Sequence, residues 1–466
     1  MYRDNFKEEQ EDIKLLVRRY ERMLKNEEIG FFEKKQFTQL INYYDARDKV
    51  EEALHVIENA LAQHPFSATF YIRKAQFLID ANREPEALDL LEQAETYDAS
   101  EMEIYLIRAD VLSTYRRFDE ALSILEYAEI KMSKSDMDEL HLAYANVYED
   151  MEDYDKMFDS LQNALLADLD CEEALERIWL CTELANKYEA SASLHNQILD
   201  KNAYSYLAWY NLGHAYNGLK MYEEAIEAFE FSYVIREKFE LAYISCVDVL
   251  FAVDEHDRAI ECLKTGLEFV PESFDFYILL GKSYEAKSNY PTAKTAYIKA
   301  ARINDQSGEA FFRLGECYAF EDRWVHALSA YENAYKLDQF NAEYVSSVAE
   351  ANYQLDNNEK ANELFKIAIE LDITEINLWV QYLSFLIDIE EFNLAFAAII
   401  IAEEHCQDAE LKCCKIAAYY QSKKTQEGTL LLTQALMDEE GFGLLLFELF
   451  PDLKEEPAIL NFIANL

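Results

Sequence analysis

Apolar residues recur at helical spacing along the chain. In the stretch 208–229, AWYNLGHAYNGLKMYEEAIEAF, they fall at i, i+3, i+4 and i+7 on two successive segments joined by a short turn. This spacing puts the apolar side chains on one face of each segment, which predicts two amphipathic helices. Similar stretches precede and follow this one, so we expect a series of helical hairpins.

The pattern repeats with a period of 34 residues. Twelve equivalent positions, called anchors below, follow this period except for one step of 36 and a last step of 33: Ala53, Ala87, Ala121, Met157, Ser191, Ala225, Ala259, Ala293, Ala327, Ala361, Ala395 and, more loosely, Gly428. A mostly small residue such as Gly213 lies twelve places before the anchor, and an aromatic residue such as Phe229 lies four places after it. The small residue lets the two helices approach closely, and the aromatic ring fills the space beside it.

The segments WYNLGHAY and EEAIEAFE resemble the tetratricopeptide repeat, and the resemblance extends over residues 34 to about 440. It implies an all-α solenoid, a right-handed superhelix of about twelve helix-turn-helix repeats. We expect a capping helix in residues 1–33, the repeat array in 34–440 and capping helices in 441–466. Met157, Ser191 and Trp179 stand where small residues are usual, so the fourth and fifth repeats are expected to pack at a changed angle.

Two nearby glycines, Gly213 and Gly218, with a lysine shortly after the second, raise the question of a phosphate-binding loop. That loop requires lysine directly after its second glycine and a preceding strand, whereas Gly218 is followed by Leu219 and then Lys220. The eight histidines are scattered, and none pairs with cysteine at metal-binding spacing. We therefore expect no catalytic residue, no cofactor and no metal site, and the protein is not expected to be an enzyme.

The charge is strongly negative, with 90 acidic against 43 basic residues and a formal net charge of −47. Residues 1–50 hold 11 acidic and 11 basic side chains, so the excess lies beyond them. Such a chain repels nucleic acid and attracts cationic partners. No stretch of 18 apolar residues is present and the cysteines read as reduced thiols, so we expect no membrane insertion and a cytoplasmic location.

The family resemblance implies that the first helices of the repeats line a concave groove. Residues 18, 15, 11, 8 and 7 places before each anchor are then expected to face it, and they are rich in carboxylates and aromatic rings. The predicted protein-binding residues are Glu139, Glu173, Glu176, Tyr210, Asp248, Phe251, Asp275, Ile278, Glu309, Phe312, Glu316, Phe320 and Tyr353. Basic residues at these places reduce to Lys35 and Lys282.

Our first hypothesis is a scaffold or adaptor that binds a basic, apolar-anchored protein segment in this acidic groove. In the alternative, the carboxylates are only solvated and the aromatic rings bury sideways against neighbouring repeats. A second function class is a chaperone-like or regulatory subunit of a larger assembly, which binds through its convex face or its ends. The oligomeric state is left open.

The two ends of the chain suggest caps. Residues 9–26, EQEDIKLLVRRYERMLKN, predict a helix whose apolar face covers the first repeat. In the alternative, its basic residues make it a docking helix for an acidic surface, such as the acidic body of a second copy. Residues 441–453, GFGLLLFELFPDL, are expected to close the far end.

Overall fold

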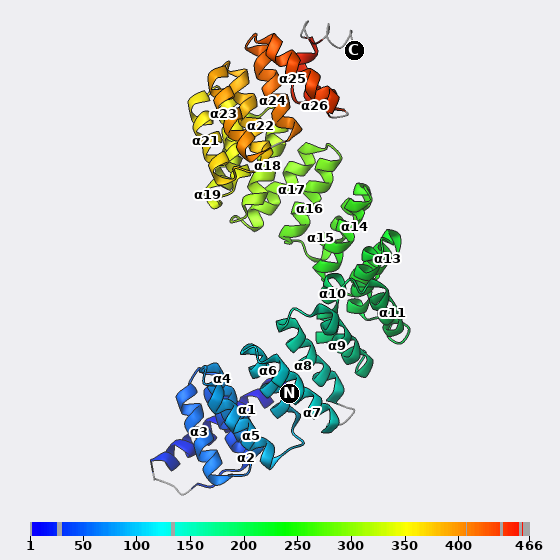
Figure 1. The fold of residues 1–466 in the computed structure, drawn as a ribbon. Helices are drawn as coiled ribbons and strands as arrows, with labels where there is room; N and C mark the ends of the chain where they lie inside the picture. The colour runs from blue at the N-terminus through cyan, green and yellow to red at the C-terminus, as the bar shows by residue number, and fades with distance from the viewer. Residues whose placement is uncertain are drawn as a thin grey trace. The chain divides into compact units, whose positions relative to one another are not determined.

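The computed structural model describes residues 2–25, 30–131, 136–406, 408–438, 441–455 and 459, with residues 2–11 and 438 described by backbone alone. Over these ranges the chain is helical and contains no strand (Figure 1). The elements are α1 (Tyr2–Leu24), α2 (Lys34–Asp45), α3 (Val50–Gln63), α4 (Ala68–Asp80), α5 (Glu84–Tyr97), α6 (Met102–Thr114), α7 (Phe118–Lys131), α8 (Met137–Asp150), α9 (Tyr154–Ala167), α10 (Glu172–Leu184), α11 (Tyr188–Leu199), α12 (Tyr206–Gly218), α13 (Tyr222–Ile235), α14 (Glu240–Ala252), α15 (His256–Phe269), α16 (Phe274–Ala286), α17 (Tyr290–Ile303), α18 (Gly308–Phe320), α19 (Trp324–Leu337), α20 (Ala342–Tyr353), α21 (Asn358–Leu371), α22 (Ile376–Asp388), α23 (Phe392–His405), α24 (Ala409–Gln421), α25 (Thr425–Asp438), α26 (Phe442–Leu449) and the 3-10 helix η2 (Pro451–Glu455).

Helices α2 to α25 follow one another as hairpins, an even-numbered first helix and an odd-numbered second helix, here called the A helix and the B helix. The described chain holds twelve such pairs, from α2–α3 to α24–α25. Each anchor lies in a B helix and is buried. The predicted all-α fold of repeated helical hairpins is confirmed.

The chain divides into two compact units, Met1–Arg236 and Glu237–Leu466. Unit 1 contains α1 to α13, and unit 2 contains α14 to α26 with η2. In unit 1, α1 packs on α2 and buries Val17 and Tyr20. In unit 2, α26 packs on α24 and buries Phe442 and Leu446. The division into caps 1–33 and 441–466 around one array stays a prediction.

Close approach of the two helices in a hairpin depends on the small residue of the A helix. A Cβ atom added to Gly213 would lie 2.6 Å from the ring of Phe229, which no real side chain tolerates without movement. The rings of Tyr297 and Tyr331 lie against Gly281 and Gly315 in the same way. Glycine at these places therefore leaves room for a ring from the B helix, as the periodic pattern predicts.

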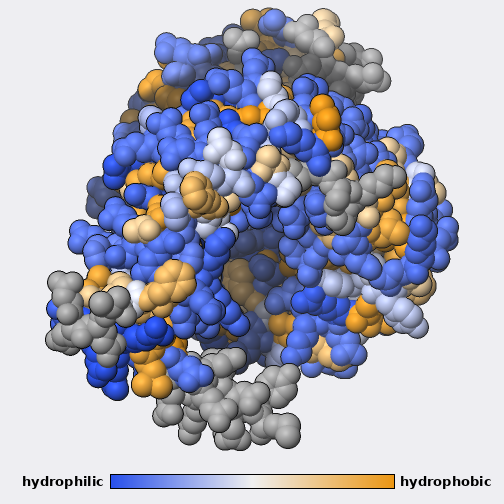
Figure 2. Space-filling model, turned by 90° about the horizontal axis from the view of Figure 1, so that it is seen from below, coloured by the Kyte–Doolittle hydropathy of each residue, from blue (hydrophilic) through white to orange (hydrophobic). Residues whose placement is uncertain are grey.

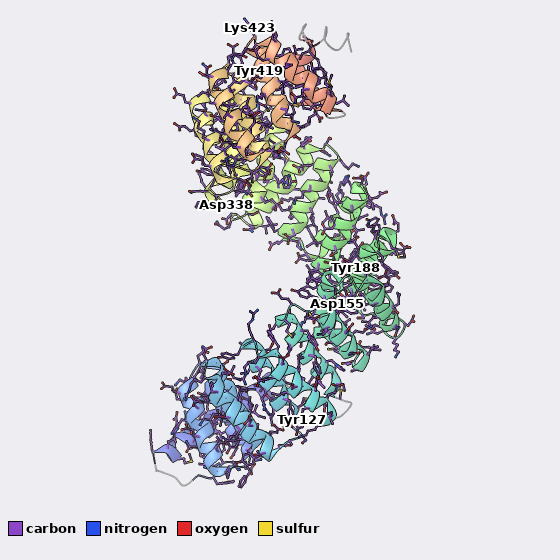
Figure 3. The ribbon with its side chains drawn as sticks, in the orientation of Figure 1. Tyr127, Asp155, Tyr188, Asp338, Tyr419 and Lys423 are labelled. Atoms are coloured by element: carbon purple, nitrogen blue, oxygen red, sulfur yellow. The ribbon has the colours of Figure 1, made fainter. Side chains whose placement is uncertain are left out.

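Each A helix ends in a residue with left-handed backbone conformation. These residues have φ between 53° and 62° and stand five places before their anchors: Asp48, Asn82, Arg116, Glu152, Asn186, Lys220, Asp254, Ser288, Asp322, Asp356, Glu390 and Lys423. The following N–H donates back across the turn, as Met221 N does to Tyr216 O at 2.9 Å and Lys424 N does to Tyr419 O at 2.9 Å. Figure 3 labels Tyr419 and Lys423 at the last of these turns. This hydrogen bond defines the Schellman C-cap, which ends the helix and turns the chain into its partner.

The fifth hairpin departs from this packing and the fourth does not. Met157 is buried in α9, and α8 packs closely on α9. By contrast, Trp179 fills the small-residue place of α10, and its ring contacts α12 through His214 at 5.1 Å between centroids. Helix α10 consequently packs on α9 and α12 and only weakly on its own partner α11. Figure 3 labels Asp155 of α9, which pairs with Lys187, and Tyr188 of α11, whose ring lies against Gly218.

Candidate functional site

The thirteen predicted groove residues all lie on A helices, from α8 to α20. Glu139, Glu173, Glu176 and Tyr210 belong to unit 1, and the other nine belong to unit 2. The structure therefore presents two separate sets of candidate residues. Each set is described within its own unit.

Unit 1 contains an open cleft of about 420 Å³ between three A helices, α6, α8 and α10. Its lining is Leu106, Ile107, Asp110, Glu139, Leu142, Ala143, Asn146, Val147 and Glu173, and we call it the apolar cleft. Apolar side chains make up much of its wall, while Asp110, Glu139 and Glu173 add carboxylates. Two of the predicted groove residues, Glu139 and Glu173, thus line the same cleft. Their apolar neighbours in this cleft were not among the predicted residues.

Three carboxylates on the A helices of unit 1, Asp45, Glu149 and Glu173, pair with arginine side chains. Arg73 pairs with Asp45 at 3.0 Å, and Arg177 bridges Glu149 at 2.5 Å and Glu173 at 3.0 Å. These ion pairs join successive repeats and compensate the charge of the carboxylates that they engage. Asp110 differs, because partial loss of hydration and the neighbouring Asp150 raise its pKa.

Unit 2 carries a row of carboxylates with neutral partners. Glu285, Glu316, Glu350 and Asp388 stand on the successive A helices α16, α18, α20 and α22, and we call them the carboxylate row. Tyrosine hydroxyls donate to three of them, Tyr297 to Glu285 at 2.7 Å, Tyr353 to Asp388 at 3.2 Å and Tyr331 to Glu316. Gln354 donates to Glu350 at 2.8 Å. These hydrogen bonds orient the carboxylates and leave their negative charge in place.

The electrostatics of the row disfavour its own ionised state. Burial raises the pKa of Glu316, Glu350 and Asp388. Neighbouring carboxylates add to the effect, since Asp388 raises the pKa of Glu350 and Asp452 raises that of Asp388. Arg313 and the hydrogen bond from the Tyr331 hydroxyl lower the pKa of Glu316, but the effect of burial is larger and its pKa stays raised. A cation brought to this row would therefore relieve an unfavourable concentration of charge.

The remaining acidic candidates of unit 2 differ from one another. Glu309 pairs with Lys282 of the preceding A helix at 2.7 Å, so the one basic residue predicted at this part of the groove is already engaged. Asp248 and Asp275 are exposed on α14 and α16. In unit 1, Glu176 is likewise exposed, on α10.

Three aromatic candidates of unit 2 are at least partly accessible. Phe320 is 64% exposed and stacks on Tyr290 with 3.6 Å between ring centroids. Phe251 is half-buried against His256, and Tyr353 is half-buried against Phe385. Phe320 is thus an exposed apolar side chain on the helix that also carries Glu316.

Tyr210, Ile278 and Phe312 are buried, with 5%, 4% and 6% of their surfaces exposed. Tyr210 packs against Trp179 and Phe229, and Phe312 packs against Tyr331 and Tyr344. These side chains stabilise the packing between helices and are closed to a partner, which corrects their assignment to an apolar track in the groove. For them the alternative of sideways burial holds.

The face drawn in Figure 2 is mostly hydrophilic, with hydrophobic residues in separate patches. Within the described ranges, no group of three His, Cys, Asp or Glu side chains could hold a metal ion. None of the described helices is long and apolar enough to cross a membrane.

Some site residues that the groove prediction did not include stand at the sequence positions that the prediction itself assigned to the groove. Leu106 and Leu142 lie fifteen places before Ala121 and Met157, the same place that yields Glu176 and Tyr210. Asp388 also lies at a groove place, seven residues before Ala395. The tyrosine partners of the row could not be inferred, because they depend on which B-helix ring reaches which carboxylate.

Comparison with known proteins gives the following matches. Residues 38–101 and 206–237 match family models described as tetratricopeptide repeat. A segment of 118 residues, 25% of this chain, is 25% identical to anaphase-promoting complex subunit 3 of Schizosaccharomyces pombe and covers 18% of it. A segment of 114 residues, 24% of this chain, is 27% identical to the BBSome complex member BBS4 of Mus musculus and covers 22% of it. The matches thus span about a fifth of these relatives.

Two solved structures are also similar in outline. The APC/C hetero-tetramer Cut9-Hcn1 matches with 13% identity, a TM-score of 0.36, and coverage of 87% of this chain and 97% of that chain. YrrB, described as a TPR protein with an unusual peptide-binding site, matches with 19% identity, a TM-score of 0.35, and coverage of 40% and 96%.

Proposed function

Because the chain belongs to the tetratricopeptide-repeat superfamily, we propose that it is a non-catalytic scaffold or adaptor that binds a basic, apolar-anchored segment of a partner protein. Proteins built from these repeats act as protein-interaction scaffolds. The proposal assigns the cationic part of the partner to unit 2 and gives unit 1 a place for an apolar side chain.

The carboxylate row is the observation that carries this proposal. Four acidic side chains on consecutive A helices accept hydrogen bonds from uncharged hydroxyl and amide groups, which do not neutralise a carboxylate. Lysine or arginine side chains of a partner would form charge-assisted hydrogen bonds with them and lower their pKa values. Phe320 provides an exposed ring beside Glu316 for an apolar contact.

The apolar cleft of unit 1 fits the apolar anchor of such a segment. Leu106, Leu142 and Val147 provide contacts for a side chain of leucine or phenylalanine size, and Glu139 provides a carboxylate at the cleft for a neighbouring basic residue. Buried apolar anchors supply most of the affinity in such complexes, while charges set the association rate and the selectivity.

We also propose that the protein is cytoplasmic and that it does not bind nucleic acid. All eight cysteines are free thiols, which fits the reducing cytosol. A net charge of −47 opposes binding to the phosphate backbone of nucleic acid.

A labelled peptide that repeats the sequence Arg-Leu-Ala tests this function, with a Glu-Leu-Ala peptide of equal length as its charge-reversed counterpart. We expect the full chain to bind the arginine peptide, and Glu316→Gln with Glu350→Gln to weaken binding about 10-fold, or about 1.4 kcal/mol. Glutamine can still accept the tyrosine hydrogen bond, so the fold is retained. Fluorescence anisotropy at low and high salt measures the affinity, which is expected to fall with salt.

The matched control is Glu359→Gln with Glu363→Gln, two exposed residues of the B helix α21. This control is expected to bind like the original chain. Equal binding of the two peptides, or unchanged binding by the row variant, would refute the proposed cation-binding role.

The second candidate function is a regulatory subunit of a larger assembly that binds through its convex face or its ends. The names of the two relatives favour it, since both are members of multiprotein complexes. Cross-links mapped between this chain and a co-purified partner distinguish the candidates: contacts on B helices favour the subunit, and contacts on A helices favour the groove.

A further inference from the structure

Helix α1 presents a basic face on an otherwise acidic protein. Lys14, Arg18, Arg22 and Lys25 are exposed and follow one another at spacings of four, four and three residues, which places them on one side of the helix. We call them the basic face. Leu15, 61% exposed, borders this face. The face therefore combines positive charge with an accessible apolar side chain.

The opposite side of α1 is fixed to unit 1. Val17 and Tyr20 are 7% and 1% exposed, and Asn59 of α3 donates a hydrogen bond to the Tyr20 hydroxyl at 3.0 Å. Arg19 donates to the carbonyl oxygen of Phe31 at 3.2 Å. These contacts hold the helix in place while Lys14 and Arg18 stay exposed to solvent. A partner can thus bind the basic face without displacing α1.

An open cleft of about 780 Å³ lies between α1 and α2 beside this face. It is lined by Asp12, Ile13, Leu15, Leu16, Arg19, Gln36, Gln39, Asn42 and Tyr43. Aliphatic side chains come from α1, and amide groups come from α2. This lining is much less acidic than that of the apolar cleft in unit 1, and it suits an apolar side chain from an acidic surface.

We propose that the basic face of α1 docks onto the carboxylate row of a second copy of this chain, with Phe320 of that copy in the cleft between α1 and α2. The inference rests on the proposed function, because α1 is itself a basic helix with an exposed apolar residue, the kind of segment that the row is proposed to bind. Charge complementarity selects this occupant. The first fifty residues are electrically balanced, whereas the body that would receive them carries the whole excess of −47. An anionic membrane is disfavoured as the occupant, because the same body would be repelled from it.

The two docking surfaces lie on different units, so the contact is heterologous. Each copy that donates α1 still offers its own carboxylate row to a further copy. Such contacts form open chains or closed rings, of which the smallest is a ring of two copies with two reciprocal contacts. Self-association through this contact would also occupy the row and compete with a basic segment from another protein.

Sedimentation velocity of the full chain over a range of concentrations tests the inference. We expect larger species at high concentration and low salt, and their loss in high salt. Two variants each remove one surface: Lys14→Glu with Arg18→Glu, and Glu316→Gln with Glu350→Gln. Each variant alone is expected to stay monomeric, and an equimolar mixture is expected to form a one-to-one complex and nothing larger, because only one complementary pair of surfaces remains.

The control variant is Arg302→Glu with Lys336→Glu, which changes the same amount of charge on the B helices α17 and α19 and should leave self-association intact. A chain that remains monomeric at all concentrations overturns the inference, as does a mixture of the two variants that stays monomeric. Binding of the arginine peptide separates the two proposals: if it binds the row of a monomeric chain, self-docking fails and the proposed function stands.

Discussion

A single methyl group decides how closely the helices of the sixth hairpin can approach. Alanine favours a helix over glycine by about 1 kcal/mol, so glycine inside α12 needs a reason in the packing. That reason is the ring of Phe229, which occupies the volume that a Cβ atom of residue 213 would need. The contact is the physical basis of the small-residue pattern.

Gly213→Ala is expected to lower the free energy of unfolding by about 1–2 kcal/mol, because overpacking outweighs the gain in helix propensity. Gly443→Ala is the matched control: its Cβ atom would lie 3.4 Å from Leu436, an ordinary contact, so this change is expected to be neutral or stabilising. Urea denaturation followed by circular dichroism measures both. A stabilised Gly213→Ala variant would show that the ring moves away freely.

Each hairpin uses a non-glycine residue in a conformation that favours glycine. The left-handed region costs an L-residue roughly 1 kcal/mol or more, because its Cβ atom crowds the backbone. The turn tolerates this cost because the Schellman hydrogen bonds and the packing of two helices fix its geometry. With twelve such turns in the described residues, the array carries a strain that recurs in each hairpin and that a glycine would remove.

Lys220→Gly is therefore expected to raise the free energy of unfolding by up to about 1 kcal/mol, since Lys220 has φ 60° and an exposed side chain. Lys366→Gly provides the opposite case, an exposed lysine inside α21, and should lower stability by about 1 kcal/mol. Thermal and urea denaturation compare the two with the original chain. If both changes destabilise equally, the left-handed strain is absent.

The periodic pattern predicted the elements well and the open surface only in part. The anchor positions identified the B helices, and even Met157 and Ser191 kept the register despite unusual side chains. Spacing alone gives the face on which a residue lies. Spacing does not show whether Phe312 is accessible to a partner protein or buried against the rings of Tyr331 and Tyr344. That outcome depends on how closely neighbouring helices pack.

At the scale of the whole molecule, His195 of unit 1 and three carboxylates of unit 2 respond to protons in opposite ways. In unit 1, His195 is fully buried, its Nδ1 lies 2.8 Å from the Ser191 carbonyl oxygen, and burial lowers its pKa to about 4. Its contribution to stability is present above the ordinary histidine pKa of about 6.5 and is lost as pH falls towards 4. In unit 2, the pKa values of Glu316, Glu350 and Asp388 are raised, which stabilises the protonated fold, so their contribution to stability is lost as pH rises through those values.

We expect residues 1–236 and 237–466, expressed separately, to fold and to differ in their pH dependence. Between pH 7 and pH 5, His195 should remove about 2 kcal/mol from the first fragment relative to a His195→Asn variant. The second fragment should gain stability over the same range, and Glu316→Gln with Glu350→Gln should flatten that gain. Urea unfolding at both pH values measures these differences. Identical slopes in all four proteins would contradict the assignment.

The contact of Trp179 with α12 has a consequence for the order of folding. A hairpin whose helices contact each other can form from adjacent segments, because little chain entropy is lost in closing its short turn. Helix α10 instead relies on α9 before it and α12 after it. The fifth hairpin cannot complete its packing until the sixth has begun to form. The fourth, fifth and sixth hairpins are therefore expected to fold together in one cooperative step.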